Sequence, residues 1–158
     1  MEIRTVGYDH PDAVKLDGLV QQEYARRYGD EGDVTPLSPH MFRPPNGIYL
    51  IAYEDDRPLA TGGWRSMAEG EDGYRDGDAE IKRMFVLEEA RGQGLARRIL
   101  GRLESDAREA GRLRMVLETG DQQPEAVALY RSSGYTPVPG FGCYRDQEGS
   151  IHMAKPLH

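Results

Sequence analysis

The chain has 158 residues, 38% of them hydrophobic, and its 20 basic and 27 acidic side chains give a net charge of -7. Nucleic-acid-binding proteins usually present a basic face, so this charge disfavours that class of partner. Cys143 is the only cysteine, which excludes an intrachain disulfide, and no apolar run approaches the roughly 18 residues that a membrane span requires.

The first half of the chain predicts a strand, a helix and a hairpin. Residues 3–6 suit a short strand, and Pro11 with Asp12 is typical of a helix start, which apolar residues at helical spacing continue until the segment 29–33 ends it. The proline-rich stretch 35–46 predicts a loop with at most one helical turn. Residues 47–53 and 58–64 then predict a β-hairpin.

The second half predicts strands alternating with helices. An acidic, glycine-rich segment (69–78) predicts an exposed loop, and strands follow at 79–87 and 113–117. A strongly amphipathic helix begins near Gly94, a second helix opens at Pro124, and two more strands lie within 135–157. This order predicts an α/β fold with a mixed sheet. With no repeat or linker, we expect a single domain over 1–158.

One segment of this pattern carries chemistry. Residues 80–100, EIKRMFVLEEARGQGLARRIL, place a β-branched and aromatic strand before a glycine-rich turn that opens directly into a helix. The start of a helix exposes unpaired N–H groups and the positive end of the helix dipole. Because glycines let an anion approach that backbone closely, the segment predicts a phosphate-binding turn.

Four interpretations of this turn compete. A P-loop requires Lys and then Ser or Thr after the last glycine, but Leu95 and Ala96 follow Gly94 here. The dinucleotide fingerprint fits Gly92 and Gly94 and fails at Arg97. A structural turn without a ligand is the plainest alternative. The remaining pattern, Arg or Gln-x-x-Gly-x-Gly or Ala, is satisfied by Arg91, Gly94 and Ala96.

Here the sequence resembles the GNAT superfamily of N-acetyltransferases. The strand 80–86 resembles the family's central strand, and the segment 123–130 with Gly134 and Tyr135 resembles its second signature helix. The resemblance covers about residues 2–157 and is strong over 79–136. The family often has Asn where this chain has Gln123 and Phe where it has Tyr135. It implies a mixed central sheet of about six to seven strands, a splayed central strand pair and about four helices.

The resemblance also implies acetyl-CoA as co-substrate, with no metal. The turn would hold the pyrophosphate through its N–H groups, and the strand before it would pair with the pantetheine arm. Arg97 ranks slightly ahead of Arg98 as a phosphate contact, and Gln123 is a further contact to the arm. The implied cofactor-binding residues are Met84, Phe85, Val86, Arg91, Gly92, Gln93, Gly94, Leu95, Ala96, Arg97, Gln123 and Tyr130.

Three residues match catalytic positions of the family. Tyr130 corresponds to the tyrosine that protonates the departing CoA thiolate, and the Val86 N–H to the oxyanion donor. Glu80 lies where several relatives place a general base, acting directly or through a water. Core packing is the alternative for Tyr130, for which the catalytic role is favoured, and Glu80 can equally be a polar residue at a strand end.

The predicted activity is therefore acetyl transfer from acetyl-CoA to the primary amine of a small molecule, by direct attack in a ternary complex. A non-catalytic acyl-CoA sensor and a protein N-terminal or lysine acetyltransferase remain alternatives. Without a signal-peptide pattern we expect a cytoplasmic protein with no membrane partner. Relatives are often dimers, so the resemblance leaves a homodimer open. Acceptor-site candidates are Tyr24, Tyr28, Phe42, Arg43, Trp64, Arg65, Phe141 and Tyr144.

Overall fold

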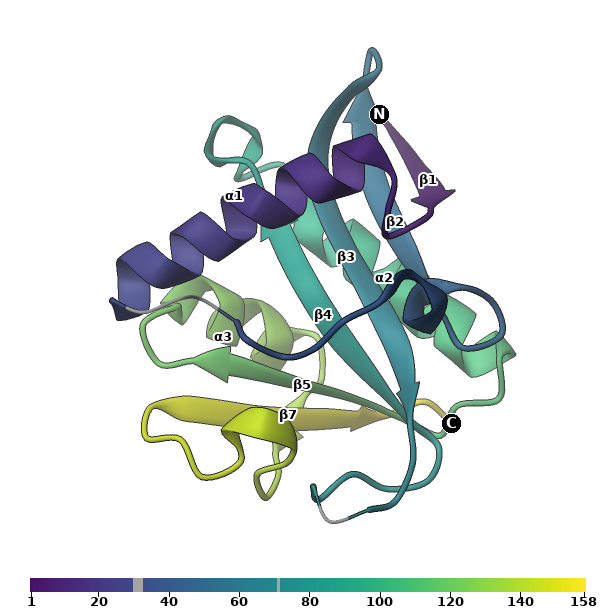
Figure 1. Cartoon of the computed structure of the whole chain (residues 1–158), viewed down its shortest axis with the longest axis vertical. Coiled ribbons are helices and arrows are strands. Elements are labelled where there is room, and N and C mark those ends of the chain that lie inside the picture. Colours follow the sequence, from purple (N-terminus) through teal and green to yellow (C-terminus); the bar gives the residue numbers. More distant parts are fainter. Residues whose placement is uncertain (30–32, 71) are drawn as a thin grey trace.

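One seven-stranded sheet, in the order β1-β2-β3-β4-β5-β7-β6, organises the chain (Figure 1). The computed structural model describes residues 1–29, 33–70 and 72–158. β4 and β5 run parallel and the other neighbouring pairs run antiparallel, which confirms the predicted mixed sheet. The strands are β1 (Glu2–Val6), β2 (Gly47–Glu54), β3 (Arg57–Met67), β4 (Asp78–Val86), β5 (Arg114–Gly120), β6 (Thr136–Pro137) and β7 (Ser150–Pro156).

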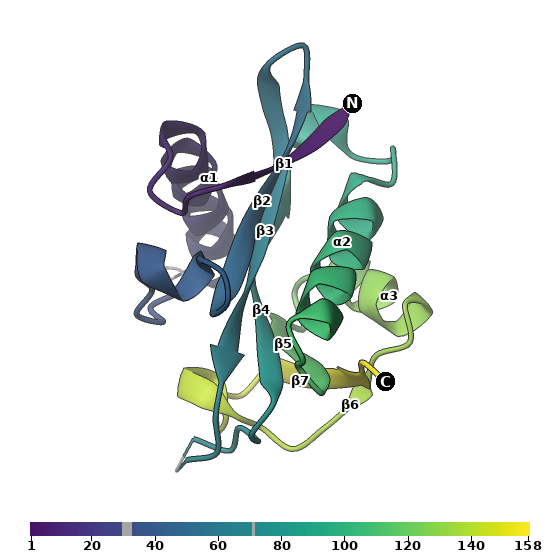
Figure 2. The same cartoon turned by 90° about the vertical axis from the view of Figure 1, so that its right-hand side faces the viewer.

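Helices cover both faces of the sheet. α1 (Pro11–Tyr28) lies on one face, and α2 (Leu95–Glu109) and α3 (Pro124–Ser132) lie on the other (Figure 2). About four helices were expected. The described residues hold three α-helices, and the proline-rich stretch forms only the 3₁₀ turn η1 (Pro39–Phe42), because prolines lack the N–H that a longer helix needs. No helix in the described ranges is long and apolar enough to cross a membrane.

The helix boundaries follow from local chemistry. Pro11 occupies the first turn of α1, where His10 Nδ1 accepts a hydrogen bond from the Asp12 N–H at 3.0 Å. Gly29, with φ of 69°, caps the last turn, as the glycine predicts. Residues 30–32 of the predicted helix-ending segment lie outside the described residues.

Of the three apolar cores among the described residues, two pack helices against the sheet. Leu50, Ile99, Leu103 and Leu117 belong to the larger core, between the sheet and α2. The smaller of these two cores contains Leu16 of α1 together with aromatic side chains of η1 and β2. The apolar face of α2 is buried as its spacing predicted, with Leu95, Ile99, Leu103 and Ala107 all inside.

β4 contains a bulge near the point where it stops pairing with β5. The register between β3 and β4 shifts between Thr61 and Gly63, where β4 contains one residue more than β3, and Arg83 takes a φ of 62°. β4 pairs with β5 only from Asp78 to Glu80. Beyond that point the two strands diverge (Figure 1), so the expected splayed pair is present at the centre of the sheet.

Most described residues of the acidic segment 69–78 are exposed, as expected of a loop, but two of them point inward. Tyr74 is 6% exposed and packs against Phe141, with ring centroids 5.1 Å apart. Asp78 is fully buried, where both of its oxygens accept hydrogen bonds from Arg114 at 2.8 and 2.9 Å. The composition of this segment concealed these inward contacts because their partners lie far away in the sequence.

Candidate active site

Two adjoining cavities open where β4 and β5 diverge. The strand cavity, of about 230 Å³, lies between the two strands, α1, α3 and the loop before β7. The turn cavity, of about 430 Å³, lies beside the end of β4 and the start of α2. The residues that line both are Tyr24, Met84, Gln123, Ala126 and Tyr130. A molecule extended along the turn cavity can therefore reach the strand cavity.

The turn cavity contains an open main-chain cradle. Gly92 and Gly94 take φ values of 84° and 77°, and a Cβ at either would meet no atom within 4 Å. The first α2 amide to reach the carbonyl four residues back is that of Arg98, which donates to Gly94 at 3.1 Å. Within the described part of the chain, the amides of 92–97 have no hydrogen-bond acceptor, and Gly94 has no side chain to cap the helix. Such a helix start attracts an anion.

Arginines surround this cradle. The Arg97 guanidinium donates to the Ser132 and Ser133 hydroxyls at 2.8 and 3.1 Å, which ties α2 to α3. Arg91 Nε donates to the Val86 carbonyl at 3.1 Å. Both arginines line the turn cavity, together with Arg27 of α1. Their positive charge favours a phosphorylated ligand.

The main chain at the end of β4 faces the gap. The Leu87 N–H donates to the Leu59 carbonyl of β3 at 2.9 Å. Because main-chain groups alternate in direction along a strand, those of Val86 point away from β3. The Val86 carbonyl accordingly meets the Arg91 side chain. This edge of β4 is open to an extended ligand.

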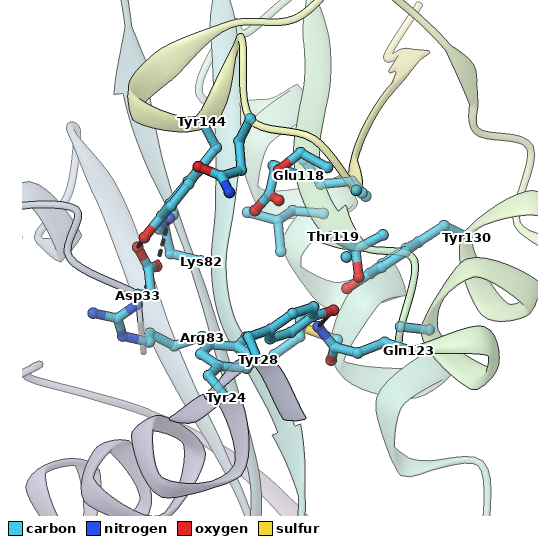
Figure 3. A pocket seen from close by; sticks show the side chains of 18 of the residues that line it. Tyr24, Tyr28, Asp33, Lys82, Arg83, Glu118, Thr119, Gln123, Tyr130 and Tyr144 are labelled. Carbon is cyan, nitrogen blue, oxygen red and sulfur yellow. Dashed lines mark hydrogen bonds and ion pairs between the residues drawn. The ribbon is translucent and has the colours of Figure 1, made fainter. Parts of the chain in front are cut away.

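Tyr130 lies at the junction of the two cavities. It is 6% exposed, and its ring stacks edge-on against Tyr135 with centroids 5.7 Å apart. No described residue hydrogen-bonds its hydroxyl, which Figure 3 shows directed into the strand cavity beside Thr119. Burial, followed by the charge of Glu118, raises the pKa of this hydroxyl, so it stays a proton donor at neutral pH.

Glu80, by contrast, lies outside both cavities. One of its carboxylate oxygens accepts from Arg65 at 2.8 and 2.9 Å, and the other accepts from the Tyr74 hydroxyl at 2.8 Å. Glu80 is 4% exposed. Both oxygens of Glu80 are occupied by Arg65 and Tyr74, and its carboxylate faces neither cavity, so the geometry does not favour Glu80 as the base.

Glu118 is an acidic residue of the strand cavity that the sequence interpretation missed. Burial raises the pKa of its carboxyl above the ordinary 4.5, with the Ser150 hydroxyl opposing this effect. It forms no ion pair with any described residue, and Figure 3 shows its carboxyl facing the cavity. The expected strand stopped at Leu117, but β5 continues to Gly120. Strand alternation along the full β5 would have placed Glu118 on the opposite face from Leu117.

The predicted cofactor residues gather at these cavities. All of them except Gln93 line one cavity or both. Gln123 donates from Nε2 to the Tyr28 hydroxyl at 3.3 Å, at the boundary between the cavities. That hydroxyl lies against Gly120, where a Cβ would approach it to 1.7 Å.

The acceptor-site candidates divide into two groups. Tyr24, Tyr28 and Tyr144 line the strand cavity. The others lie elsewhere, because the large aromatic side chains were needed to fill the cores and the arginines found carboxylate partners. Phe42, Trp64 and Phe141 are buried, Arg65 pairs with Glu80, and Arg43 lies on the surface 3.5 Å from Asp9.

Known proteins resemble this chain along most of its length. A family model described as the acetyltransferase (GNAT) family matches residues 15–135. An IAA acetyltransferase of Azospirillum brasilense is 46% identical over 113 residues, which are 72% of this chain and 70% of that protein. YjgM of Escherichia coli strain K12, an uncharacterized N-acetyltransferase, is 28% identical over 156 residues, or 94% of this chain and 90% of that protein.

Solved structures share the architecture. A Klebsiella pneumoniae protein described as an acyl-CoA N-acyltransferase has a TM-score of 0.80 at 25% identity, covering 99% of this chain and 97% of its own. An aminoglycoside 6'-N-acetyltransferase complexed with coenzyme A has a TM-score of 0.72 at 18% identity, covering 100% and 98%, a likeness of fold alone. The fold and the relatives together define an acyltransferase of the α/β class. The chain belongs to the acetyltransferase (GNAT) family, as the sequence resemblance predicted.

Proposed function

We propose that this acetyltransferase moves the acetyl group of acetyl-CoA to the primary amine of a small molecule, with both substrates bound at once. The observation that carries the proposal is the continuity of the two cavities at Tyr130. One cavity offers free main-chain amides at a helix start, and the other offers a half-buried carboxyl, that of Glu118. A single passage thus joins an anion cradle to a proton acceptor.

The turn cavity suits the nucleotide end of acetyl-CoA. The amides of 92–97 would bind its pyrophosphate, with Arg97 and Arg91 adding positive charge. The open edge of β4 at Met84 and Val86 would pair with the pantetheine arm, beside Phe85 and Gln123. These contacts would direct the thioester toward Tyr130.

Three groups of this chain would then serve the reaction. When bound, acetyl-CoA supplies an acetyl group activated as a thioester. The Val86 N–H would donate to the thioester oxygen. Glu118 would remove a proton from the acceptor ammonium, because its pKa is raised and it faces the cavity. Tyr130 would donate its hydroxyl proton to the departing thiolate and would regain the second proton that the acceptor nitrogen loses as the amide forms. Glu80, held by Arg65 and Tyr74, would keep a structural role.

The size of the strand cavity supports a small acceptor. Its volume of about 230 Å³ is below the roughly 300–1,000 Å³ typical of sites for drug-sized ligands. A protein acceptor would present only one side chain or terminus there. The size of the strand cavity therefore favours a free small-molecule amine over a folded protein as the acceptor.

Calorimetry and a thiol-release assay test the proposal in sequence. We expect acetyl-CoA to bind with heat and NAD to give none, and a panel of small amines to release free CoA thiol. Binding of acetyl-CoA without turnover on any amine would indicate the sensor alternative. Binding of NAD in preference to acetyl-CoA would overturn the proposal altogether.

A further inference from the structure

Some charged side chains of the strand cavity form ion pairs with one another, and others do not. Among the described residues, three acids and two bases line it: Asp33, Glu118, Glu148, Lys82 and Arg83. Lys82 Nζ lies 2.8 Å from Asp33 and donates to the Thr35 hydroxyl at 3.3 Å. Both bases are therefore already engaged, because Arg83 pairs with Asp33 as well and with Asp17 of α1 at 2.6 Å.

Asp33 has no capacity left for a ligand. One of its oxygens accepts from the Thr35 N–H, the Thr35 hydroxyl and the Tyr144 hydroxyl at 2.9, 2.6 and 3.1 Å. The other oxygen receives Lys82 and Arg83. Partial burial would raise the pKa of this carboxyl, but the two cations outweigh it and hold the pKa below the ordinary 3.8. The two acids and two bases of this cluster balance one another.

Glu118 is left as the carboxyl inside the cavity that forms no ion pair with a described residue, although the more distant charge of Lys82 acts on it. Glu148 belongs to the exposed rim. Around Glu118 the cavity presents tyrosines, and Figure 3 shows them on several sides of the space that its carboxyl faces. Tyrosine ring faces and hydroxyl oxygens both attract an ammonium group. The tyrosines of the lining are Tyr24, Tyr28, Tyr130 and Tyr144.

We infer that the acceptor is a small cationic amine that carries no carboxylate, such as an alkyl monoamine or diamine, and is not an amino acid. This inference rests on the proposed function and names the substrate class of the same site. A carboxylate in this cavity would lie near Glu118 with no unpaired cation among the described lining residues, or would have to displace Asp33 from Lys82 or Arg83. Either arrangement leaves a charge unpaired in a poorly solvated site, which is unfavourable.

Three acceptors of equal chain length test the inference. Pentylamine, 1,5-diaminopentane and 5-aminopentanoate differ only in the group at the far end of the chain. We expect kcat/KM for both amines to exceed that for the amino acid at least tenfold. An amino acid that reacts as well as pentylamine would overturn the inference.

A binding measurement tests this inference independently of the proposed reaction. Each compound is titrated calorimetrically into protein saturated with CoA, with or without the substitution Glu118→Gln. We expect pentylamine to bind more tightly than 5-aminopentanoate, and Glu118→Gln to weaken pentylamine at least tenfold while leaving the amino acid unchanged or improved. Glu109→Gln, at the exposed end of α2, is the control and should change neither.

The outcomes of the two assays differ for the two claims. A binding preference for the amines without thiol release would support the cationic site and refute the transferase proposal. Thiol release with equal binding of all three compounds would support the transferase and refute the cationic site. Failure of both amines to bind would also refute the cationic site.

Discussion

Arg83 Nε donates to Asp17 Oδ1 at 2.6 Å from a backbone with φ of 62°. A left-handed conformation costs a non-glycine residue about 1–2 kcal/mol. This strained residue lies in the bulge of β4, beyond the point where β4 stops pairing with β5, and it lines the strand cavity. Ion pairs to Asp17 and Asp33 anchor its side chain to α1 and to the segment after it, and we infer that they stabilise the bulge.

Replacing Arg83 should therefore destabilise the whole chain. Arg83→Leu leaves Asp17 without its ion-pair partner and Asp33 with Lys82 alone, and we expect the free energy of unfolding to fall by about 3–5 kcal/mol. Urea denaturation measures the change. Arg4→Leu is the control, because Arg4 forms exposed ion pairs with Glu2 and Asp56 that are worth less than about 1 kcal/mol. Equal losses in the two variants would contradict the role of the buried pair.

Gly94, in the turn before α2, and Gly111, beyond its far end, allow a matched pair of substitutions. Gly94 and Gly111 have φ values of 77° and 84°, and a Cβ at either would meet open space. Alanine at each position should thus cost a similar backbone strain of about 1 kcal/mol. Gly94→Ala also places a methyl group in the turn cavity, so we expect its Kd for acetyl-CoA to rise at least fivefold. Gly111→Ala, beyond the far end of α2, should leave that Kd unchanged.

Thermal unfolding together with calorimetry checks this pair. Similar losses of Tm with different values of Kd would support a ligand at the cradle. If the two variants bound acetyl-CoA equally well, the main-chain cradle at 92–97 would not be the pyrophosphate site.

These features of the turn were predictable because they are local. The amphipathic spacing of α2 and the glycines before it lie within about 20 consecutive residues, so the sequence displays the phosphate pattern directly. The position of Val86 relative to the turn follows from the same segment. The mixed sheet was predictable in its order of elements for a related reason, since each strand is bounded by its own turn residues.

The charged residues of the site were not predictable in this way. The environment of Glu80 depends on Arg65 across the β3–β4 pair and on Tyr74 in a loop. Glu118 belongs to β5 because that strand pairs with β7 as far as Gly120 and Ser150. Contacts between distant parts of the chain therefore decide which glutamate is held in an ion pair and which faces a cavity. The order of residues in the sequence does not reveal those contacts.

The substitution Tyr130→Phe tests whether the Tyr130 side chain serves the reaction through its hydroxyl or only packs in the core. Because the hydroxyl has no partner among the described residues, its removal should leave the fold and the Kd for acetyl-CoA nearly intact. If Tyr130 protonates the thiolate, kcat should fall about a hundredfold, within the usual range for a general acid. Steady-state kinetics and calorimetry measure the two quantities.

Tyr135→Phe is the control for Tyr130→Phe. Its hydroxyl donates to Glu104 at 2.7 Å in the core, so its loss should cost about 1–2 kcal/mol of stability with kcat retained. A kcat for Tyr130→Phe equal to that of the unaltered protein would remove Tyr130 from the mechanism.

The pH dependence of the reaction distinguishes the two glutamates. A general base works only when deprotonated, so the rate should fall as the pH drops through the pKa of the Glu118 carboxyl, which burial raises above 4.5. Glu118→Gln should lower kcat/KM about a hundredfold and abolish this acid limb. Glu80→Gln removes the charge that faces Arg65, so we expect a loss of stability and an unaltered acid limb. If Glu80→Gln abolished the limb and Glu118→Gln retained it, the base would be Glu80 and the assignment of Glu118 would be wrong.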